Sequence, residues 1–387
     1  MNDDAPTAGN DALIAIIRAE IRGAGGSIPF ARFMERALTH PVHGYYASGR
    51  GAPGRAGADF LTAPETSPYF GRCLAVQVAE CWERLNRPAP FAVWEHGAGA
   101  GTLALTLLDT LMEQSPDTYA ATTYWLDDVA PPSLDRAHAK LAAHGAAGHI
   151  GWGAPDSGMT GVVIANEFVD ALPVHRVRVH GGQLEEAYVG WSDETETFIE
   201  VWAEPSTPAL SEYFATEEIS LAEGQIAEVC LAATVWVNAV AARMARGYVI
   251  TIDYGDEARA LYRAGRFPEG SLMCYHRHTA NREPLRAVGE QDMTAHVDFT
   301  ALEWAGALAC LTTLGLTTQA ALLSSLGLGE MLYAATQATA DAFGYIDERN
   351  AVIRLIEPSA MGRNRVLFQG KAVPTEPPLR GLLEPPI

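Results

Sequence analysis

Four groups of polar residues follow stretches of the chain that are predicted to be buried strands. They are Glu95 with a glycine run, Asp127 with Asp128, Asn166 with Glu167, and Asp253 with Tyr254. Carboxylates accept hydrogen bonds from hydroxyl and amino groups, and glycines allow a flat ligand to approach the backbone closely. Ligands of an open parallel sheet bind at the carboxyl ends of its strands. We therefore expect the four groups to form one binding site.

The glycine spacing separates two classes of cofactor. Gly97, Gly99 and Gly101 lie between a predicted strand and a predicted helix, and Glu95 precedes them. A dinucleotide-binding turn has glycines at relative positions one, three and six, whereas Thr102 occupies the sixth position here. The pattern disfavours a nicotinamide dehydrogenase and resembles the S-adenosylmethionine loop of class I methyltransferases. A tight turn without a ligand remains the alternative.

The two acids after the second strand have different expected roles. Adjacent strand residues point to opposite faces, so only one of Asp127 and Asp128 can face the site. We favour Asp128, whose carboxylate could accept hydrogen bonds from both hydroxyls of a ribose. A solvated acid at the start of a loop is the alternative reading.

Asn166 and Glu167 follow a buried strand, where polar groups need a hydrogen-bonding or cationic partner. Beside a sulfonium cofactor, Glu167 could hold a cationic acceptor and orient its nitrogen for methyl transfer. The alternative is that both residues only cap the turn that follows.

Alternating strands and helices predict the fold that would bring these residues together. The pattern is typical of an α/β doubly wound, mostly parallel sheet with helices on both faces. Two alternating strands around Gly181 and Gly182 predict an inserted hairpin. A long helix is predicted over 227–246 with Gly247 as its cap, and Ser27 is predicted to begin a helix near Pro29.

Four parts of the chain are expected. Residues 1–88 form a helical and loop region over the active site, and 174–245 form an inserted hairpin and helical region. The core comprises 89–173 and 246–371, with a loop-rich insertion near 260–300. A proline-rich tail covers 372–387.

Composition excludes several classes of function. The 387 residues carry a net charge of −20, which argues against nucleic acid as a partner and suits a cationic one. The five cysteines lack the spacing of zinc ligands or disulfides. The loop histidines His276, His278 and His296 match no metal-ligand pattern, so no metal is expected. No secretion signal, transit peptide or membrane span is evident, and a cytoplasmic location is expected.

Motifs spread over residues 28–370 point to one family. The chain resembles the MidA-type methyltransferases, which include the mitochondrial complex I assembly factor that methylates arginine. The resemblance rests on the order and spacing of several blocks: Gly44-Tyr45-Tyr46, Asp59-Phe60, Thr62, Pro64-Glu65, Glu95 with the three glycines, Ala165 to Phe168, Asp170 to Val174, Ile252 to Gly255, and Val297 to Phe299.

The resemblance implies a class I methyltransferase fold, S-adenosylmethionine as donor, and a loop from Asp59 to Glu65 over the cofactor. The donor would contact these residues: Thr62, Pro64, Glu95, Gly97, Ala98, Gly99, Gly101, Asp128 and Asn166. Its adenine would contact Trp152 or Phe168. Glu167 would bind the acceptor and, with Asn166, form the catalytic pair, whereas Glu65, Asp253 and Tyr254 are further candidates for acceptor binding.

The expected activity is methylation of arginine in a partner protein. The alternative is a non-catalytic assembly factor that has kept the fold and binds a partner chain. The sequence leaves the oligomeric state open, with a homodimer as one alternative. His96 and Val169 depart from the family pattern, which has an apolar residue and an aromatic residue at these positions, and they leave acceptor specificity more open than cofactor binding.

Overall fold

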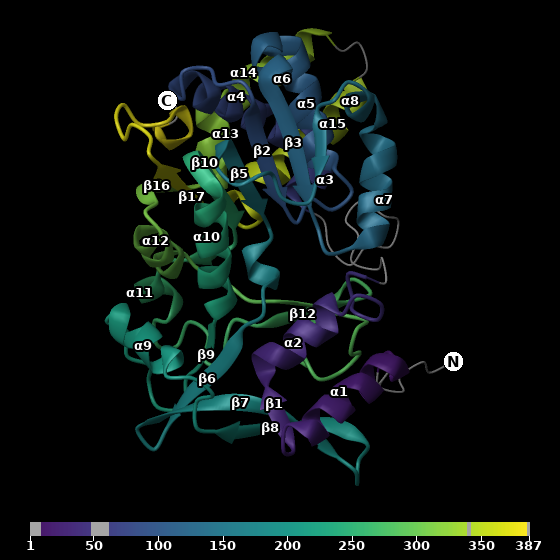
Figure 1. Ribbon diagram of the computed structural model, residues 1–387, viewed down its shortest axis with the longest axis vertical. Coiled ribbons are helices and arrows are strands. Elements are labelled where there is room, and N and C mark those ends of the chain that lie inside the picture. Colours follow the sequence, from purple (N-terminus) through teal and green to yellow (C-terminus); the bar gives the residue numbers. More distant parts are fainter. Residues whose placement is uncertain (1–8, 48–61, 339–341, 385–387) are drawn as a thin grey trace.

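The computed structural model describes residues 9–47, 62–338 and 342–384, with the side chains of 336–338 and 342–347 excepted. A seven-stranded sheet forms the upper half of the molecule in Figure 1. Its order is β16 (Thr312–Thr318), β17 (Arg365–Lys371), β10 (Met244–Asp253), β5 (Met159–Asn166), β2 (Phe91–His96), β3 (Thr122–Asp127) and β4 (Ile150–Trp152). β17 runs antiparallel to both of its neighbours, and the pairings from β10 to β4 are parallel.

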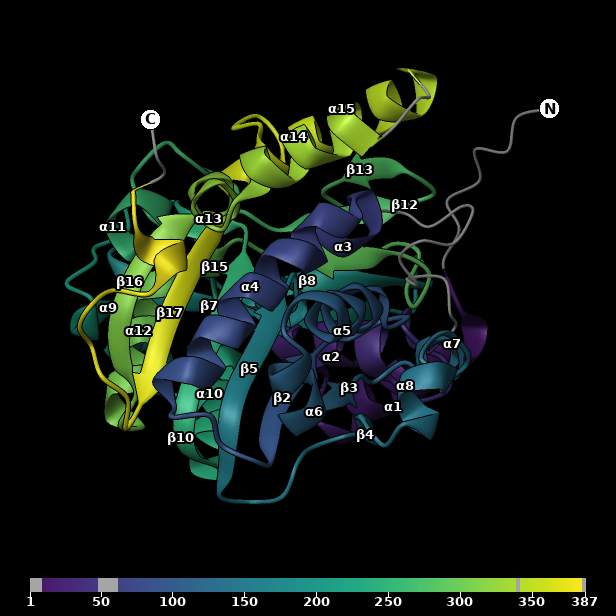
Figure 2. The same ribbon diagram turned by 90° about the horizontal axis from the view of Figure 1, so that it is seen from above.

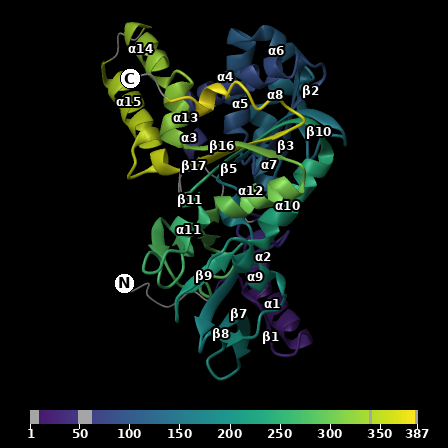
Figure 3. The ribbon, with the colours of Figure 1, turned by 90° about the vertical axis from the view of Figure 1, so that its left-hand side faces the viewer.

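Helices cover both faces of this sheet, because its central strands bury side chains on both sides. On β2, Val93 packs toward one face and Trp94 toward the other. The first face carries α4 (Pro68–Arg84), α5 (Thr102–Gln114), α7 (Pro131–Lys140), α13 (Gln319–Ser325), α14 (Leu328–Ala338) and α15 (Ala342–Ile356). The second carries α10 (Leu231–Arg243) and α12 (Phe299–Leu308), and Figure 3 shows the separation. The predicted α/β class is confirmed.

A second body lies below the carboxyl ends of these strands in Figure 1. Its five-stranded sheet has the order β1 (Ser27–Pro29), β7 (Gln183–Ser192), β6 (His175–His180) and β9 (Ile226–Val229), and β8 (Thr197–Ala203) also pairs with β7. α1 (Asp11–Gly23) and α2 (Phe30–Thr39) share a hydrophobic core with this sheet. The N-terminal residues and the inserted segment therefore pack together, although the sequence separates them.

Short elements complete the chain. They are α3 (Ala63–Thr66), α6 (Pro116–Ala121), α8 (Ala142–Ala146), α9 (Ala209–Thr216), α11 (Ala258–Leu261), the paired strands β11 (Gly255–Asp256) and β15 (Val297–Asp298), and the sheet of β12 (Met273–His276), β13 (Thr279–Asn281) and β14 (Asp292–Thr294). Figure 2 shows α13, α14 and α15 grouped together beyond α4. The predicted domain boundaries stay a prediction.

Of three predictions about local structure, one is confirmed and two are wrong. The hairpin around Gly181 and Gly182 is present as β6 and β7. The helix predicted over 227–246 is wrong at both ends, because β9 precedes it and β10 begins at Met244. Gly247 lies inside β10, where a β-carbon would come within 2.0 Å of the carbonyl oxygen of Gly161. Ser27 is the first residue of β1 and caps no helix.

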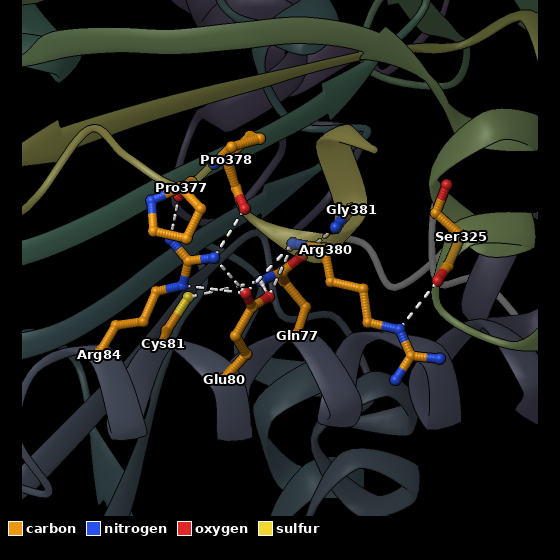
Figure 4. A network of polar contacts seen from close by, with 9 residues as sticks. All are labelled: Gln77, Glu80, Cys81, Arg84, Ser325, Pro377, Pro378, Arg380 and Gly381. Carbon is orange, nitrogen blue, oxygen red and sulfur yellow. Dashed lines mark hydrogen bonds and ion pairs between the residues drawn. The ribbon is translucent and has the colours of Figure 1, made fainter. Parts of the chain in front are cut away.

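The C-terminal tail runs across α4 through a network of polar contacts (Figure 4). Arg84 donates to the carbonyl oxygens of Pro377 and Pro378, the latter at 2.6 Å. Glu80 accepts from the Arg380 amide at 2.9 Å, and the Gln77 side chain accepts from the Gly381 amide at 2.9 Å. The tail is therefore attached to α4 by several consecutive backbone groups.

Candidate functional site

A cavity of about 290 Å³ lies at the carboxyl ends of β2, β3 and β5. The predicted site residues that line it are Thr62, Pro64, Glu65, Glu95, Gly97, Ala98, Gly99, Asp128, Asn166, Glu167 and Phe168. Three of the four strand-end groups therefore meet at one site. The expectation that only one of Asp127 and Asp128 faces the site is wrong, because both line the cavity. Gly101, Trp152, Asp253 and Tyr254 do not line the cavity.

The three glycines of the turn differ in what they approach. All three have positive φ values, of 68°, 53° and 71° for Gly97, Gly99 and Gly101. A β-carbon on Gly99 would meet no atom within 4 Å, so this residue faces open space. A β-carbon on Gly101 would lie 3.1 Å from both Ala137 and Leu141. Gly99 thus leaves room at the cavity, whereas Gly101 allows α5 to pack against α7.

Asp128 is held close to the glycine turn by its own carboxylate. One oxygen accepts from the Gly99 amide and the other from the Ala130 amide, each at 2.7 Å. Burial raises the pKa of this carboxyl, and the two amides act in the opposite direction. Because each oxygen keeps a further lone pair, the carboxylate can still accept hydrogen bonds from a ligand in the cavity.

Glu167 has a strained backbone at the end of β5. Its φ is +48°, which L-residues adopt rarely. One carboxylate oxygen accepts from the Ala63 amide at 2.9 Å, so Glu167 connects β5 to α3. Burial raises the pKa of Glu167 to about 7. The neighbouring Asn166 is buried, and its side-chain oxygen has no hydrogen-bond partner within the described residues.

Glu95 lies under the glycine turn with 4% of its surface exposed. It accepts a hydrogen bond of 2.8 Å from the hydroxyl of Tyr124, and burial raises its pKa to about 8. A buried carboxyl of this kind becomes more acidic when a cation binds beside it. The ammonium group of an amino acid would be such a cation.

α3 borders the cavity beside the start of α5. Its Glu65 accepts a hydrogen bond from the hydroxyl of Thr102, and Thr102 accepts one from Lys140. Glu65 and Thr62 both line the cavity. The expected loop begins at Asp59, but 59–61 lie outside the described residues.

Asp253 and Tyr254 turn away from the cavity. Asp253 is fully buried, and one oxygen accepts from the amides of Phe168, Val169 and Asp170 at 3.0–3.2 Å. Tyr254 donates to Asp170. Their expected contact with the acceptor therefore has no support in the geometry, because Asp253 instead fixes the turn that follows Glu167.

Sequence reasoning missed two residues that line the cavity from the N-terminal part of the chain. Thr39 and Tyr46 line the cavity from the second body. The Tyr46 hydroxyl donates to Asp292 at 2.9 Å. The Gly44-Tyr45-Tyr46 block was a signal that could have identified one of them. Of the two residues expected to contact adenine, Phe168 lines the cavity, whereas Trp152 stacks on His138 at 3.5 Å.

The cavity is strongly acidic. Its lining includes five carboxyl groups, those of Glu65, Glu95, Asp127, Asp128 and Glu167, and none of the described lysines or arginines. No group of three or more histidine, cysteine, aspartate or glutamate residues in the described part of the chain could hold a metal ion. In the same residues, no helix has the length and apolar character needed to cross a membrane.

These residues fit S-adenosylmethionine, which carries an ammonium group, a sulfonium and a ribose diol. Gly99 leaves space beside the backbone, Asp128 can accept from hydroxyls, and Glu95 can face a cation. Asn166 supplies a buried oxygen that lacks a partner among the described residues.

Comparisons with known proteins agree with this fit. Residues 73–317 match a family described as S-adenosyl-L-methionine-dependent methyltransferases. A protein of Burkholderia thailandensis, whose crystal structure contains S-adenosylhomocysteine, is 33% identical with a TM-score of 0.85; the match covers 96% of this chain and 94% of that one.

Two curated relatives are animal proteins. The protein arginine methyltransferase NDUFAF7 homolog of Drosophila melanogaster is 30% identical over 75% of this chain and 69% of its own length. The protein arginine methyltransferase NDUFAF7 of Danio rerio is 26% identical over 79% of this chain and 74% of its own length. Both are named as mitochondrial proteins, and this contradicts the cytoplasmic location expected from the sequence.

The family model covers more than half of the chain, and the solved relative matches almost all of it. The chain belongs to the MidA-type family of S-adenosylmethionine-dependent methyltransferases.

Proposed function

We propose that this enzyme methylates an arginine side chain of a partner protein. The observation that carries the proposal is the concentration of carboxyl groups at the cavity, whose lining includes none of the described lysines and arginines. Buried carboxylates are costly without a cation, and a guanidinium group supplies one.

Glu167 is the acceptor-binding residue in this proposal. One of its oxygens is engaged by the Ala63 amide, which leaves the other oxygen for the guanidinium. Burial holds the pKa of Glu167 near 7, and a bound guanidinium would favour the ionised form. The donor supplies an electrophilic methyl group, so the residues of the chain mainly position the acceptor nitrogen.

The donor-binding roles follow from the same geometry. Glu95 would face the ammonium group, Asp128 the ribose, and the backbone at Gly97, Ala98 and Gly99 the methionyl part. Thr62 and Pro64 would cover the donor from α3. The names of the animal relatives, which are protein arginine methyltransferases, support the choice of acceptor.

The test uses the purified chain, a radiolabelled donor and a protein extract from a strain that lacks this gene. We expect labelled protein whose hydrolysate contains methylarginine, and Glu167→Gln should remove the label while S-adenosylhomocysteine still binds. Label in another amino acid would overturn the choice of arginine. Donor binding without any labelled protein would favour the alternative, an assembly factor that does not catalyse transfer.

The same extract can test the remaining expectations about partners. Affinity capture tests for the predicted protein partner and for the predicted absence of nucleic acid. Size-exclusion chromatography tests for a homodimer. We expect captured protein that carries the methylated arginine.

A further inference from the structure

One edge of the five-stranded sheet can still accept a strand. β8 pairs with β7 along one side, from Thr197 opposite Ser192 to Ala203 opposite Glu186, and none of the other described strands pairs with β8. Figures 1 and 3 show β8 at the end of the second body that lies away from the seven-stranded sheet. An edge strand presents a row of backbone N–H and C=O groups that an added strand can bind.

β8 lacks the features that usually protect an edge strand. Its seven residues, Thr-Phe-Ile-Glu-Val-Trp-Ala, include no lysine, proline or glycine, and its pairing with β7 continues without a bulge. All of them except Phe198 and Trp202 are exposed. Natural edge strands are commonly short, bulged, or interrupted by lysine or proline. A long and regular edge of this kind suits the addition of an extended peptide as a further strand.

The two faces of β8 differ in what covers them. Phe198 and Trp202 pack into the core that the sheet shares with α1 and α2. Ile199 and Val201 point to the opposite face and are 40% and 41% exposed. A β-carbon on Gly190 of β7 would lie 3.4 Å from Ile199, so the isoleucine side chain lies over β7 on this outer face. Apolar side chains of an added strand could therefore pack beside Ile199 and Val201.

The charge around β8 determines the chemistry of the strand that it can accept. Asp193, Glu194 and Glu196 lie in the turn before β8, Glu204 follows it, and all four are exposed. The sequence contains no lysine, arginine or histidine between positions 181 and 242. Electrostatic complementarity then favours a strand that carries positive charge.

Arginines of α1 and β6 neutralise only part of this negative charge. Arg18 lies 3.6 Å from Asp193, whose side chain stays exposed. On the core-facing side of β8, Arg176 pairs with Glu200 at 2.5 Å. A second copy of the chain that paired through its own β8 would bring two acidic turns together, and like charges repel. The charge therefore favours a basic segment of another protein over a second copy.

We propose that β8 docks an extended, lysine- or arginine-rich segment of the protein substrate as an added strand, with apolar side chains of that segment beside Ile199 and Val201. The identity of this partner as the substrate rests on the proposed function. Because β8 lies on the far side of the second body from the seven-stranded sheet, the docked segment holds the substrate and takes no part in methyl transfer.

The first test is a binding measurement with the full chain and a synthetic peptide, and it needs no methyl transfer. Calorimetry compares the peptide Lys-Val-Lys-Val-Lys-Val-Lys with a peptide in which glutamate replaces each lysine. The lysine peptide should bind at least about tenfold more tightly. Its binding should also slow the hydrogen exchange of backbone amides in β8, because an added strand pairs with them.

Two double variants separate docking at β8 from general attraction to an acidic protein. Ile199→Lys with Val201→Lys should weaken binding of the lysine peptide by about tenfold or more, because it removes the apolar contact and adds positive charge at the edge. Val235→Lys with Leu308→Lys is the matched control, since it changes the net charge equally at two exposed apolar residues of α10 and α12. The control should bind the peptide within about twofold of wild type.

The following results would overturn the proposal. They are equal weakening in both double variants, equal affinity for the acidic peptide, and unchanged hydrogen exchange in β8. A wild-type dimer in size-exclusion chromatography that becomes a monomer in the β8 double variant would assign the edge to a second copy instead.

The labelled extract connects β8 to the substrate. The Ile199→Lys, Val201→Lys variant should label protein about tenfold less than wild type, with unchanged affinity for S-adenosylhomocysteine. Loss of peptide binding with undiminished labelling would show that β8 does not dock the substrate. A wild-type chain that labels no arginine would contradict the proposed function, whereas the peptide measurements would still decide whether β8 pairs with a basic strand.

Discussion

The ends of β5 and β10 carry acidic residues at neighbouring positions of one sheet, yet their carboxylates face different surroundings. Glu167, just after β5, lines the cavity and uses one oxygen to hold the Ala63 amide. Asp253, the last residue of β10, is fully buried and accepts from the amides of Phe168 to Asp170 and of Tyr254. The first can bind a ligand, and the second shapes the backbone that presents it.

A strand-end acid is therefore identified as a ligand-binding group by its remaining hydrogen-bonding capacity. From sequence, both acids were candidates for acceptor binding, because both follow buried strands. Only the structure shows that the amides after Glu167 fold back onto Asp253. Four experiments test whether the two acids differ in this way.

The largest effect is expected for Glu167→Gln. Loss of a preorganised charge at the reacting centre should reduce turnover by about 100-fold or more, while the affinity for S-adenosylhomocysteine changes little. Single-turnover kinetics and calorimetry measure the two quantities. Turnover within a few-fold of wild type would remove Glu167 from the acceptor site and with it the contrast to Asp253.

Asp253→Ala should lower the stability of the fold more than it affects acceptor binding. The change leaves four backbone amides without their acceptor, and we expect a loss of about 3 kcal/mol in the free energy of unfolding. Urea denaturation measures this loss. If the variant kept its stability but lost acceptor binding, Asp253 would be a binding residue after all.

The pH dependence of the free energy of unfolding should reflect the raised pKa values of Glu95 and Glu167. Burial raises the pKa of Glu95 to about 8 and that of Glu167 to about 7, from a usual value of 4.5. At a pH between the usual pKa of a group and its raised pKa, the folded state binds more protons than the unfolded state. The free energy of unfolding should therefore fall as pH rises from about 5 to 8, by up to about 1.4 kcal/mol per pH unit for each group while it titrates.

Denaturation at several pH values tests this expectation. Glu95→Gln and Glu167→Gln should each give a flatter profile than the wild-type protein. A variant profile as steep as that of the wild-type protein would contradict the assigned direction of the pKa shift of the residue replaced.

The smallest effect is expected for Tyr254→Phe. It removes the hydroxyl that donates to Asp170, whose other carboxylate oxygen has no partner in the described part of the chain. We expect a loss of about 1 kcal/mol in stability and an unchanged KM for the acceptor. A large rise in that KM would restore Tyr254 as an acceptor contact.

Local patterns predicted the parts of the site that depend on local backbone chemistry. The glycine turn, Asp128 and the Asn166-Glu167 pair each follow a buried strand, and they do meet at one cavity. Contacts between distant segments could not be predicted in this way. Thr39 reaches the cavity because α2 packs with the inserted sheet, which no short pattern encodes.

The helix end predicted at Gly247 is wrong because it, too, depends on a contact between distant segments. A glycine after a helical pattern indicates a cap. Here the glycine is required because β10 approaches Gly161 of β5 too closely for a β-carbon. Such a pairing of residues on neighbouring strands is visible only once the strands are side by side.

The tail contacts on α4 have a consequence for the time course of folding during synthesis. β17 inserts between β10 and β16, and the residues from Pro377 to Gly381 then bind Gln77, Glu80 and Arg84. Glu80 therefore cannot form its contact with Arg380 until the chain has grown by a further 300 residues. The ribosome must release the residues up to Gly381 before the central sheet and the contacts of α4 are complete, and contacts of such long sequence separation form slowly.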